Sequence, residues 1–266
     1  MRPPVPGRFS NLEFDDESRA RQRETPQARV EEQDKPDLLS RAHEEQRSGQ
    51  FESALRLYTR CLQEDRKLVP AWVGQVQMLV ALGEHHEARI WSDKALELFR
   101  NNGELLAAKA QACVRLNDLP TAYRCSDASL QMPGSSPWRW EVRGELLVAH
   151  GKKQFETCFQ TALTEPAADW FDRVIIARML VFHHRVAAAV HYLQQALELE
   201  PVHAPTWFEL GQCQAALGLM AAARSSYDRC LELRPDYAAA RRERDSLDWV
   251  SPLAWLRGLW RRWRRR

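Results

Sequence analysis

The side chains of this sequence that could bind a metal ion are its histidines, of which there are eight. Four of them form two adjacent pairs, His85 with His86 and His183 with His184, and the pairs stand far apart in the chain. Neighbouring histidines on a turn point in different directions, whereas a zinc site needs several converging ligands. We therefore interpret these histidines as solvated turn residues and predict neither a metal nor any other cofactor.

The six cysteines could act as nucleophiles, metal ligands or disulfide partners. They include no CxxC pair, and a chain of 266 residues does not need disulfides to support its core, a pattern typical of reduced intracellular thiols. No neighbouring residue favours a thiolate, so we expect inert packing side chains. The P-loop, GxGxxG, GxSxG, HExxH and kinase signatures are also absent from the sequence. The chain is therefore predicted not to be an enzyme.

The composition is that of a folded chain, with 44% apolar and 28% charged residues. The net charge is +2, but six arginines lie within residues 257–266, so the rest of the chain carries −4. With this nearly neutral charge, the chain is not expected to bind nucleic acid non-specifically over its whole surface. The first ten residues lack the apolar stretch of a signal peptide, and no window approaches the roughly 18 apolar residues of a membrane span. We expect a cytoplasmic protein.

A leucine recurs through most of the chain at intervals of 34, 34, 33, 34 and 34 residues. The residue before it is small each time, which would let two helices approach closely. The pairs are Cys61–Leu62, Ala95–Leu96, Ser129–Leu130, Ala162–Leu163, Ala196–Leu197 and Cys230–Leu231. Self-similarity at this period predicts a stack of repeated helix pairs.

Each unit carries a second set of recurring residues upstream of the first. A large residue is followed four places later by a small one: Leu38 and Ala42, Trp72 and Val76, Leu106 and Ala110, Trp140 and Gly144, Arg173 and Ala177, Trp207 and Gly211. A break between two helices is then predicted at Gly49, Gly83, Asn117, Gly151, His184 and Gly218. Gly and Asn favour such breaks because they tolerate the left-handed conformation that ends a helix. Apolar residues at helical spacing predict helices over residues 71–82 and 87–99.

These residues resemble the tetratricopeptide repeat. The last unit matches the family pattern best, with Trp207, Leu210, Gly211, Gly218, Ala223, Tyr227, Cys230 and Pro235. The resemblance implies an all-α, right-handed superhelical solenoid of six helix-turn-helix units, at 35–68, 69–102, 103–136, 137–169, 170–203 and 204–237. Arg173, Phe155, Pro133 and Pro166 depart from the pattern, which puts the local geometry around them in doubt. We further expect a disordered arm over 1–34, a capping helix over 238–248 and a basic tail over 249–266.

The resemblance also implies that the first helix of each unit lines a concave groove that binds another polypeptide. Residues four places apart on that face would make the contacts: Leu39, His43, Val73, Gln77, Ala107, Gln111, Glu141, Glu145, Val174, Arg178, Phe208 and Gln212. Glutamine can both donate to and accept from a peptide backbone. The alternative is that the polar members of this set simply face solvent. The leading hypothesis is a non-enzymatic scaffold with a protein or peptide partner.

The C-terminal tail supports competing hypotheses. At about 100° per residue, Leu253, Trp255, Leu256, Leu259, Trp260 and Trp263 share one side of a helix that follows Ser251 and Pro252, with Arg257, Arg261, Arg262, Arg264, Arg265 and Arg266 on the other. Such a helix suits an anionic membrane surface, which would make the chain a peripheral membrane adaptor. It would equally dock on the last repeats or in a partner's groove. Binding of single-stranded nucleic acid is the least favoured use of the tail.

Overall fold

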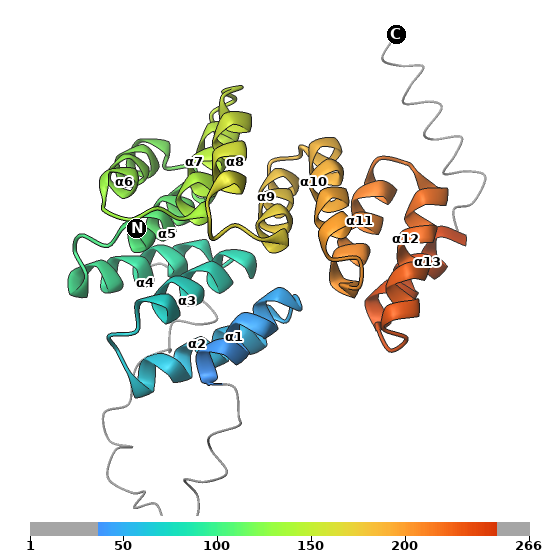
Figure 1. Ribbon diagram of the computed structural model, residues 1–266, viewed down its shortest axis with the longest axis horizontal. Coiled ribbons are helices and arrows are strands. Elements are labelled where there is room, and N and C mark those ends of the chain that lie inside the picture. The colour runs from blue at the N-terminus through green and yellow to red at the C-terminus, as the bar shows by residue number, and fades with distance from the viewer. Residues whose placement is uncertain (1–36, 249–266) are drawn as a thin grey trace, which may run out of the picture. The chain divides into compact units, whose positions relative to one another are not determined.

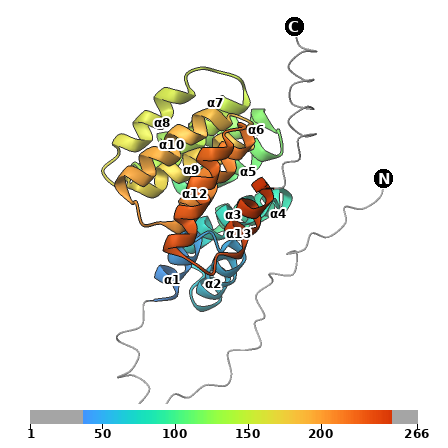
Figure 2. The ribbon, with the colours of Figure 1, turned by 90° about the vertical axis from the view of Figure 1, so that its right-hand side faces the viewer.

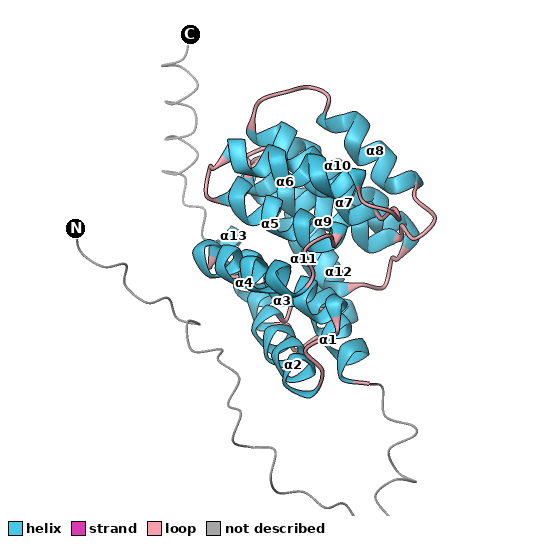
Figure 3. Ribbon diagram, turned by 90° about the vertical axis from the view of Figure 1, so that its left-hand side faces the viewer, coloured by secondary structure: helices cyan, strands magenta, loops and turns pink. Residues whose placement is uncertain are grey.

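The computed structural model describes residues 37–248, which form thirteen α-helices and no β-strand (Figure 3). The predictions for the N-terminal arm and for the Trp/Arg tail fall outside these residues. The chain divides after Ala168 into two compact units. Unit 1 comprises the described residues up to Ala168, and unit 2 those from Asp169 onward.

Unit 1 contains four helix pairs, joined by short turns (Figure 1). They are α1 (Leu38–Arg47) with α2 (Phe51–Glu64), α3 (Val69–Ala81) with α4 (His85–Leu98), α5 (Gly103–Arg115) with α6 (Leu119–Gln131), and α7 (Pro137–Ala149) with α8 (Phe155–Thr164). Each pair packs together, and α2 packs on α3, α4 on α5 and α6 on α7. The apolar face of each pair is therefore covered partly by the next pair along the chain.

Unit 2 contains two helix pairs and one further helix. The pairs are α9 (Trp170–Phe182) with α10 (Val186–Leu199) and α11 (Ala204–Ala216) with α12 (Met220–Leu233), and α13 (Ala238–Asp248) packs on α12 (Figures 1 and 2). Ala240 of α13 is fully buried against Cys230 of α12. Most described side chains on the remainder of α13 are exposed, whereas Arg244 is half-buried and pairs with Asp228. This polar helix covers the outer face of the last pair.

The turn inside each helix pair is made by one residue in the left-handed backbone region. Gly49, Gly83, Gly151 and Gly218 have φ between 71° and 83°, and Asn117 and His184 have φ of 60° and 59°. These are the six residues that the sequence predicted to break each unit into two helices, and the prediction is confirmed. The left-handed residue ends the first helix by reversing the chain within a few residues.

The small residues that precede the recurring leucines are more completely buried than the leucines. Cys61, Ala95, Ser129, Ala162, Ala196 and Cys230 all lie in the core, while four of the six leucines are half-buried. Gly144 and Gly211 lie at the contact between paired helices, because a Cβ atom there would overlap the ring of Phe159 or Tyr227 on the second helix. Close approach of the two helices is therefore the stricter requirement of the repeat.

The turn between α6 and α7 contains the displaced Pro133 and depends on one arginine. Arg139 is buried and donates from its guanidinium to the backbone carbonyls of Met132, Pro133 and Gly134, at 3.2, 3.3 and 2.8 Å. Its Nε pairs with the carboxylate of Glu104 at 2.8 Å. In a regular turn such backbone carbonyls accept hydrogen bonds from backbone N–H groups. Here the side chain of Arg139 donates those bonds instead. The departure from the repeat pattern at Pro133 is accommodated locally.

Replacing Gly144 with Ala should destabilise the protein even though Ala favours a helix by about 1 kcal/mol over Gly. The added methyl group has to displace the Phe159 ring, and overpacking of a core costs about 1–3 kcal/mol. We expect a net loss of up to about 2 kcal/mol in the free energy of unfolding, measured by urea denaturation. Adding Phe159→Leu should recover part of that loss, and a G144A variant more stable than the wild type would contradict the packing argument.

Candidate partner-binding face

The first helices of the pairs form the inner layer of unit 1. α3 packs on α5 and α5 on α7, and α1 also touches α3. No contact of comparable extent joins two second helices within the described part of unit 1. Because the layer whose helices approach each other lies on the inside of a curved array, the first helices line the concave face. We call this surface the inner face of unit 1.

The predicted groove residues of unit 1 differ widely in exposure. His43 is exposed, and Leu39, Val73 and Gln77 are half-buried. Gln111 and Ala107 are buried, and Glu141 and Glu145 have no exposed surface at all. The alternative that the polar residues merely face solvent therefore does not describe Gln111, Glu141 or Glu145. Whether any of the set contacts a partner stays a prediction.

A buried ion pair joins α5 to α7 on the inner face. The Arg115 Nε lies 2.6 Å from Oε1 of Glu145, and Gln111 Nε2 donates to Oε2 of Glu145 at 3.0 Å. The side chains of Arg115 and Glu145 are 9% and 0% exposed, so water screens this pair weakly. Burial lowers the pKa of His85 on α4, and the nearby Arg115 cation lowers the pKa further, against an opposing effect of Glu145. Both burial and the Arg115 cation therefore favour the neutral form of His85.

A neutral hydrogen-bond chain joins α1 to α3. Tyr58 of α2 donates its hydroxyl to Oε1 of Gln46, and the amide of Gln46 donates to Oε1 of Gln77 at 3.0 Å. The ring of His43 packs edge-on against the ring of Tyr58, with centroids 5.8 Å apart. Two residues predicted for the groove, His43 and Gln77, are therefore positioned by contacts to α2 and α1.

The corresponding face of unit 2 carries an arginine–carboxylate contact. Arg178 of α9 binds both carboxylate oxygens of Glu209 on α11, through Nε at 3.1 Å and Nη2 at 2.6 Å. The guanidinium also lies over the ring of Phe171, 5.3 Å from its centroid. The charge of Arg178 is thus matched inside unit 2, and its side chain is held in one direction.

The other groove residues predicted in unit 2 also differ widely in the exposure of their side chains. Val174 is buried, and Phe208 is half-buried and packs against the rings of Tyr227 and Tyr237. Gln212 is exposed. Of the four residues predicted for the groove in unit 2, Gln212 is therefore the one that presents a fully exposed side chain.

The sequence analysis missed the partners that hold these residues, namely Gln46, Arg115 and Glu209. Arg115 follows Gln111 by one helical turn, so its place on the same face was visible in the helical spacing. The pairing was not visible, because it depends on how closely α5 approaches α7. Gln46 and Glu209 likewise gain their roles only from the neighbouring first helix.

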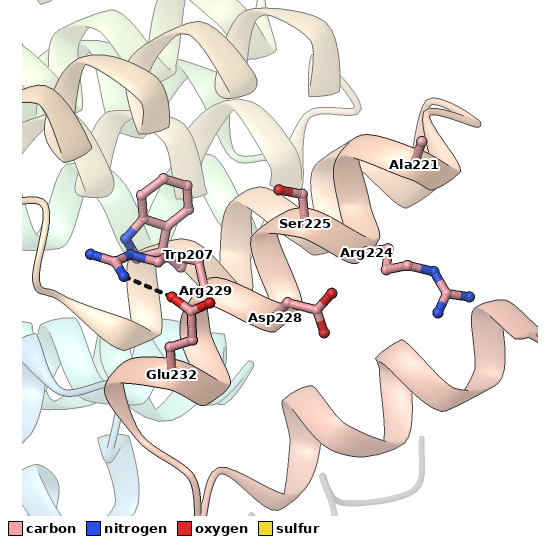
Figure 4. A pocket seen from close by; sticks show the side chains of 7 residues that line it. All are labelled: Trp207, Ala221, Arg224, Ser225, Asp228, Arg229 and Glu232. Atoms are coloured by element: carbon pink, nitrogen blue, oxygen red, sulfur yellow. Dashed lines mark hydrogen bonds and ion pairs between the residues drawn. The ribbon is translucent and has the colours of Figure 1, made fainter.

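A separate open cavity of about 500 Å³ lies on the outer surface of unit 2 (Figure 4). Six of its seven lining residues come from α12 and the seventh is Trp207 of α11: the set is Trp207, Ala221, Arg224, Ser225, Asp228, Arg229 and Glu232. Its charged groups already have partners, since Arg229 pairs with Glu232 and Asp228 with Arg244. The sequence marked Trp207 only as a repeat residue.

The groups that could do covalent or metal chemistry are buried or dispersed. Cys61, Cys113, Cys158, Cys213 and Cys230 are buried and Cys125 is partly buried. Burial raises the pKa of the Cys113, Cys213 and Cys230 thiols to about 11, which keeps them protonated at neutral pH. Within residues 37–248 there is no cluster of three or more histidine, cysteine or carboxylate side chains able to hold a metal ion. None of the helices in the same range has the length and apolarity needed to cross a bilayer.

Replacing Glu145 with Gln should be costly because it leaves the Arg115 cation buried without its counter-ion. Breaking a buried pair by removing one partner costs about 3–5 kcal/mol, and we expect a loss of that order in the free energy of unfolding. Asp93→Asn is the matched control, since the Asp93–Lys109 pair is partly exposed and such pairs contribute about 1 kcal/mol or less. Urea denaturation of the two variants should separate them. Equal losses would contradict a buried ion pair at Glu145.

Comparisons with known proteins agree on one family. A family model for the tetratricopeptide repeat matches residues 39–103 and 176–238, with one match in each unit. The tetratricopeptide repeat-containing protein trd-1 of Caenorhabditis elegans is 31% identical over 65 residues, which is 24% of this chain and only 8% of that protein.

A solved tetratricopeptide-repeat structure shares the fold at low sequence identity. A tetratricopeptide repeat protein from Parabacteroides merdae superposes with a TM-score of 0.50 at 18% identity, over 83% of this chain and 88% of that one. YrrB, described as a TPR protein with an unusual peptide-binding site, gives a TM-score of 0.40 at 18% identity over 71% of this chain and 97% of its own. With paired helices and left-handed turns, both units have an all-α helical-repeat fold, and residues 39–103 and 176–238 match the tetratricopeptide repeat, a fold that generally serves as a scaffold for protein–protein interaction.

Proposed function

We propose that this chain is a non-enzymatic scaffold that binds a partner polypeptide along the inner faces of its repeats. The observation that carries the proposal is the set of polar bonds between successive first helices: Gln46 to Gln77, Gln111 to Glu145 and Arg178 to Glu209. These bonds fix the spacing of the helices that would line the groove. A surface held in place before binding loses less entropy when a partner docks.

The exposed groups on these faces suit a polypeptide more than a charged small molecule. The charges of Glu145 and Arg178 are each matched by a neighbour within the same unit. What stays accessible is the imidazole of His43, the half-buried amide of Gln77, and the exposed amide of Gln212. Amides donate and accept at once, which is what a peptide backbone requires. The partner would therefore be recognised by backbone groups and apolar anchors, with net charge a minor factor.

Apolar side chains available to anchor the partner lie beside these polar groups. Val73 in unit 1 and Phe208 in unit 2 are half-buried. Half-buried apolar groups on a concave surface gain most from a partner that completes their burial, at about 25 cal/mol per Å² of apolar area. Each unit thus offers at least one apolar contact next to a hydrogen-bonding amide.

Site-specific photo-crosslinking in the native host tests this assignment and identifies the partner in the same step. A benzophenone amino acid at His43 or at Gln212 should capture the same polypeptide, which mass spectrometry would identify. The same probe at Arg60 of α2 or Ala222 of α12, both exposed on second helices, should not capture it. Capture from the second helices alone, or from none of the four positions, would refute the proposed binding face.

The identified polypeptide then allows a quantitative check. His43→Ala combined with Gln212→Ala should weaken its binding about tenfold, or 1.4 kcal/mol, because exposed contacts are lost and the core is left intact. Unchanged circular dichroism would show that the fold is preserved. Arg60→Ala with Ala222→Ser is the control pair and should leave the dissociation constant unchanged.

A further inference from the structure

One end of unit 2 exposes a group of large apolar side chains. The α9–α10 turn and the α11–α12 turn lie at the same end of this unit, at its upper side in Figure 1. Val181 and Phe182 at the end of α9 are each 40% exposed, and Leu217, Leu219 and Met220 around the second turn are 42%, 51% and 42% exposed. We call these five residues the apolar edge of unit 2.

At the same end of the helix pairs in unit 1, the places equivalent to Leu219 carry the polar residues Gln50, Glu84, Asp118 and Lys152. The apolar residues at these turns, such as Phe51, Leu82 and Leu119, are half-buried. The large apolar residues exposed in the described part of unit 1 are Ile90 and Leu98, which lie inside or at the end of α4 and away from those turns. Because large apolar side chains exposed together at one end of a protein often mark a covered or interacting region, the apolar edge is a candidate docking surface.

The direction of α13 brings the chain to this edge. Ala240 of α13 lies against Cys230, and Arg244 contacts Asp228 at 3.4 Å, so advancing along α13 means moving back along α12 toward its first residue. Met220 precedes Asp228 by eight residues, which is about 12 Å of α12 at 1.5 Å per residue. Pro252 follows Arg244 by the same number of residues, so the chain beyond α13 has enough residues to span the distance to Leu219 and Met220.

The sequence that begins at this point has the matching chemistry. Ser251 and Pro252 are residues that favour the start of a helix, and the following apolar set is Leu253, Trp255, Leu256, Leu259, Trp260 and Trp263. Arginines occupy the opposite side of that helix. With its apolar side on the edge, such a helix would keep its own arginines in water.

We propose that residues 253–263 form an amphipathic helix that packs its Leu/Trp side on the apolar edge of unit 2. The four residues between Asp248 and Leu253 are the whole linker, so the segment and its docking surface stay within reach of each other at a high effective concentration. A second molecule or a membrane would have to compete with that intramolecular contact. The segment thus extends the cap of the solenoid from α13 around to the helix turns.

Hydrogen exchange of the full-length chain tests the docking directly. Amides of residues 253–263 should exchange at least tenfold more slowly in the full chain than in a synthetic peptide of residues 249–266. Leu219→Glu with Met220→Glu should abolish that protection, since it places charge on two exposed positions where the Leu/Trp side would rest. The control is Leu199→Glu with Val202→Glu, which makes the same change at exposed residues of the α10–α11 turn, at the opposite end of the pairs.

Three outcomes would overturn the proposal. Exchange of residues 253–263 at the peptide rate, in wild type and both variants alike, would show that nothing covers their apolar side. Protection that persists in L219E/M220E, or that grows with protein concentration, would assign the contact to another surface or to a second copy. Protection that appears only with vesicles containing phosphatidylserine would assign the segment to a membrane surface. Circular dichroism of the helices at 37–248 should be unchanged in both variants, because the substituted side chains are exposed.

Discussion

The close approach of the two helices in each pair is the constraint on which the rest of the structure depends. It is met by Gly144 and Gly211, whose missing side chains leave room for an aromatic ring of the second helix. Only when the helices are this close do both of their apolar faces point toward the next pair. The small residues Ala95 and Cys230 are fully buried, whereas four of the six recurring leucines are only half-buried. Stability is accordingly shared between neighbouring pairs.

On the inner faces, residues of the proposed binding surface also form the contacts between successive first helices. Glu145 and Arg178 stand where a partner would be expected to bind, yet each forms an ion pair with the adjacent first helix. A buried pair such as Arg115–Glu145 gains little net stability over an apolar contact, but losing one partner is costly. Such a pair therefore restricts which substitutions the inner face tolerates. In the proposed function, partner choice would depend on the accessible groups, among them His43 and Gln212.

The sequence alone predicted the helical repeat and its turns. The residues it identified correctly are those whose backbone conformation or side-chain size is restricted at their own position. His184 and Asn117 were predicted as breaks despite not being glycine, because their place in the repeat demanded a left-handed residue, and both have positive φ. The pairing of Gln111 with Glu145 was not predicted. Periodicity assigns a residue to a face of its own helix, but the distance to the next helix depends on the packing of every small residue between them. The same limit applies to Arg139, whose bonds to the α6–α7 turn replace a regular backbone arrangement.

The end of a repeat array poses a problem that the interior does not have, because the last pair lacks a following pair to cover it. Here α13 covers α12 with a helix that is apolar only at the contact, around Ala240, and is mostly exposed and charged beyond it. That solution closes the side of the last pair but does not reach the turns, where Leu219 and Met220 lie exposed. The apolar residues at the turns of unit 1, such as Leu82 and Leu119, are half-buried. The helix that we propose for residues 253–263 would cover the exposed turns of unit 2 with no contribution from another molecule.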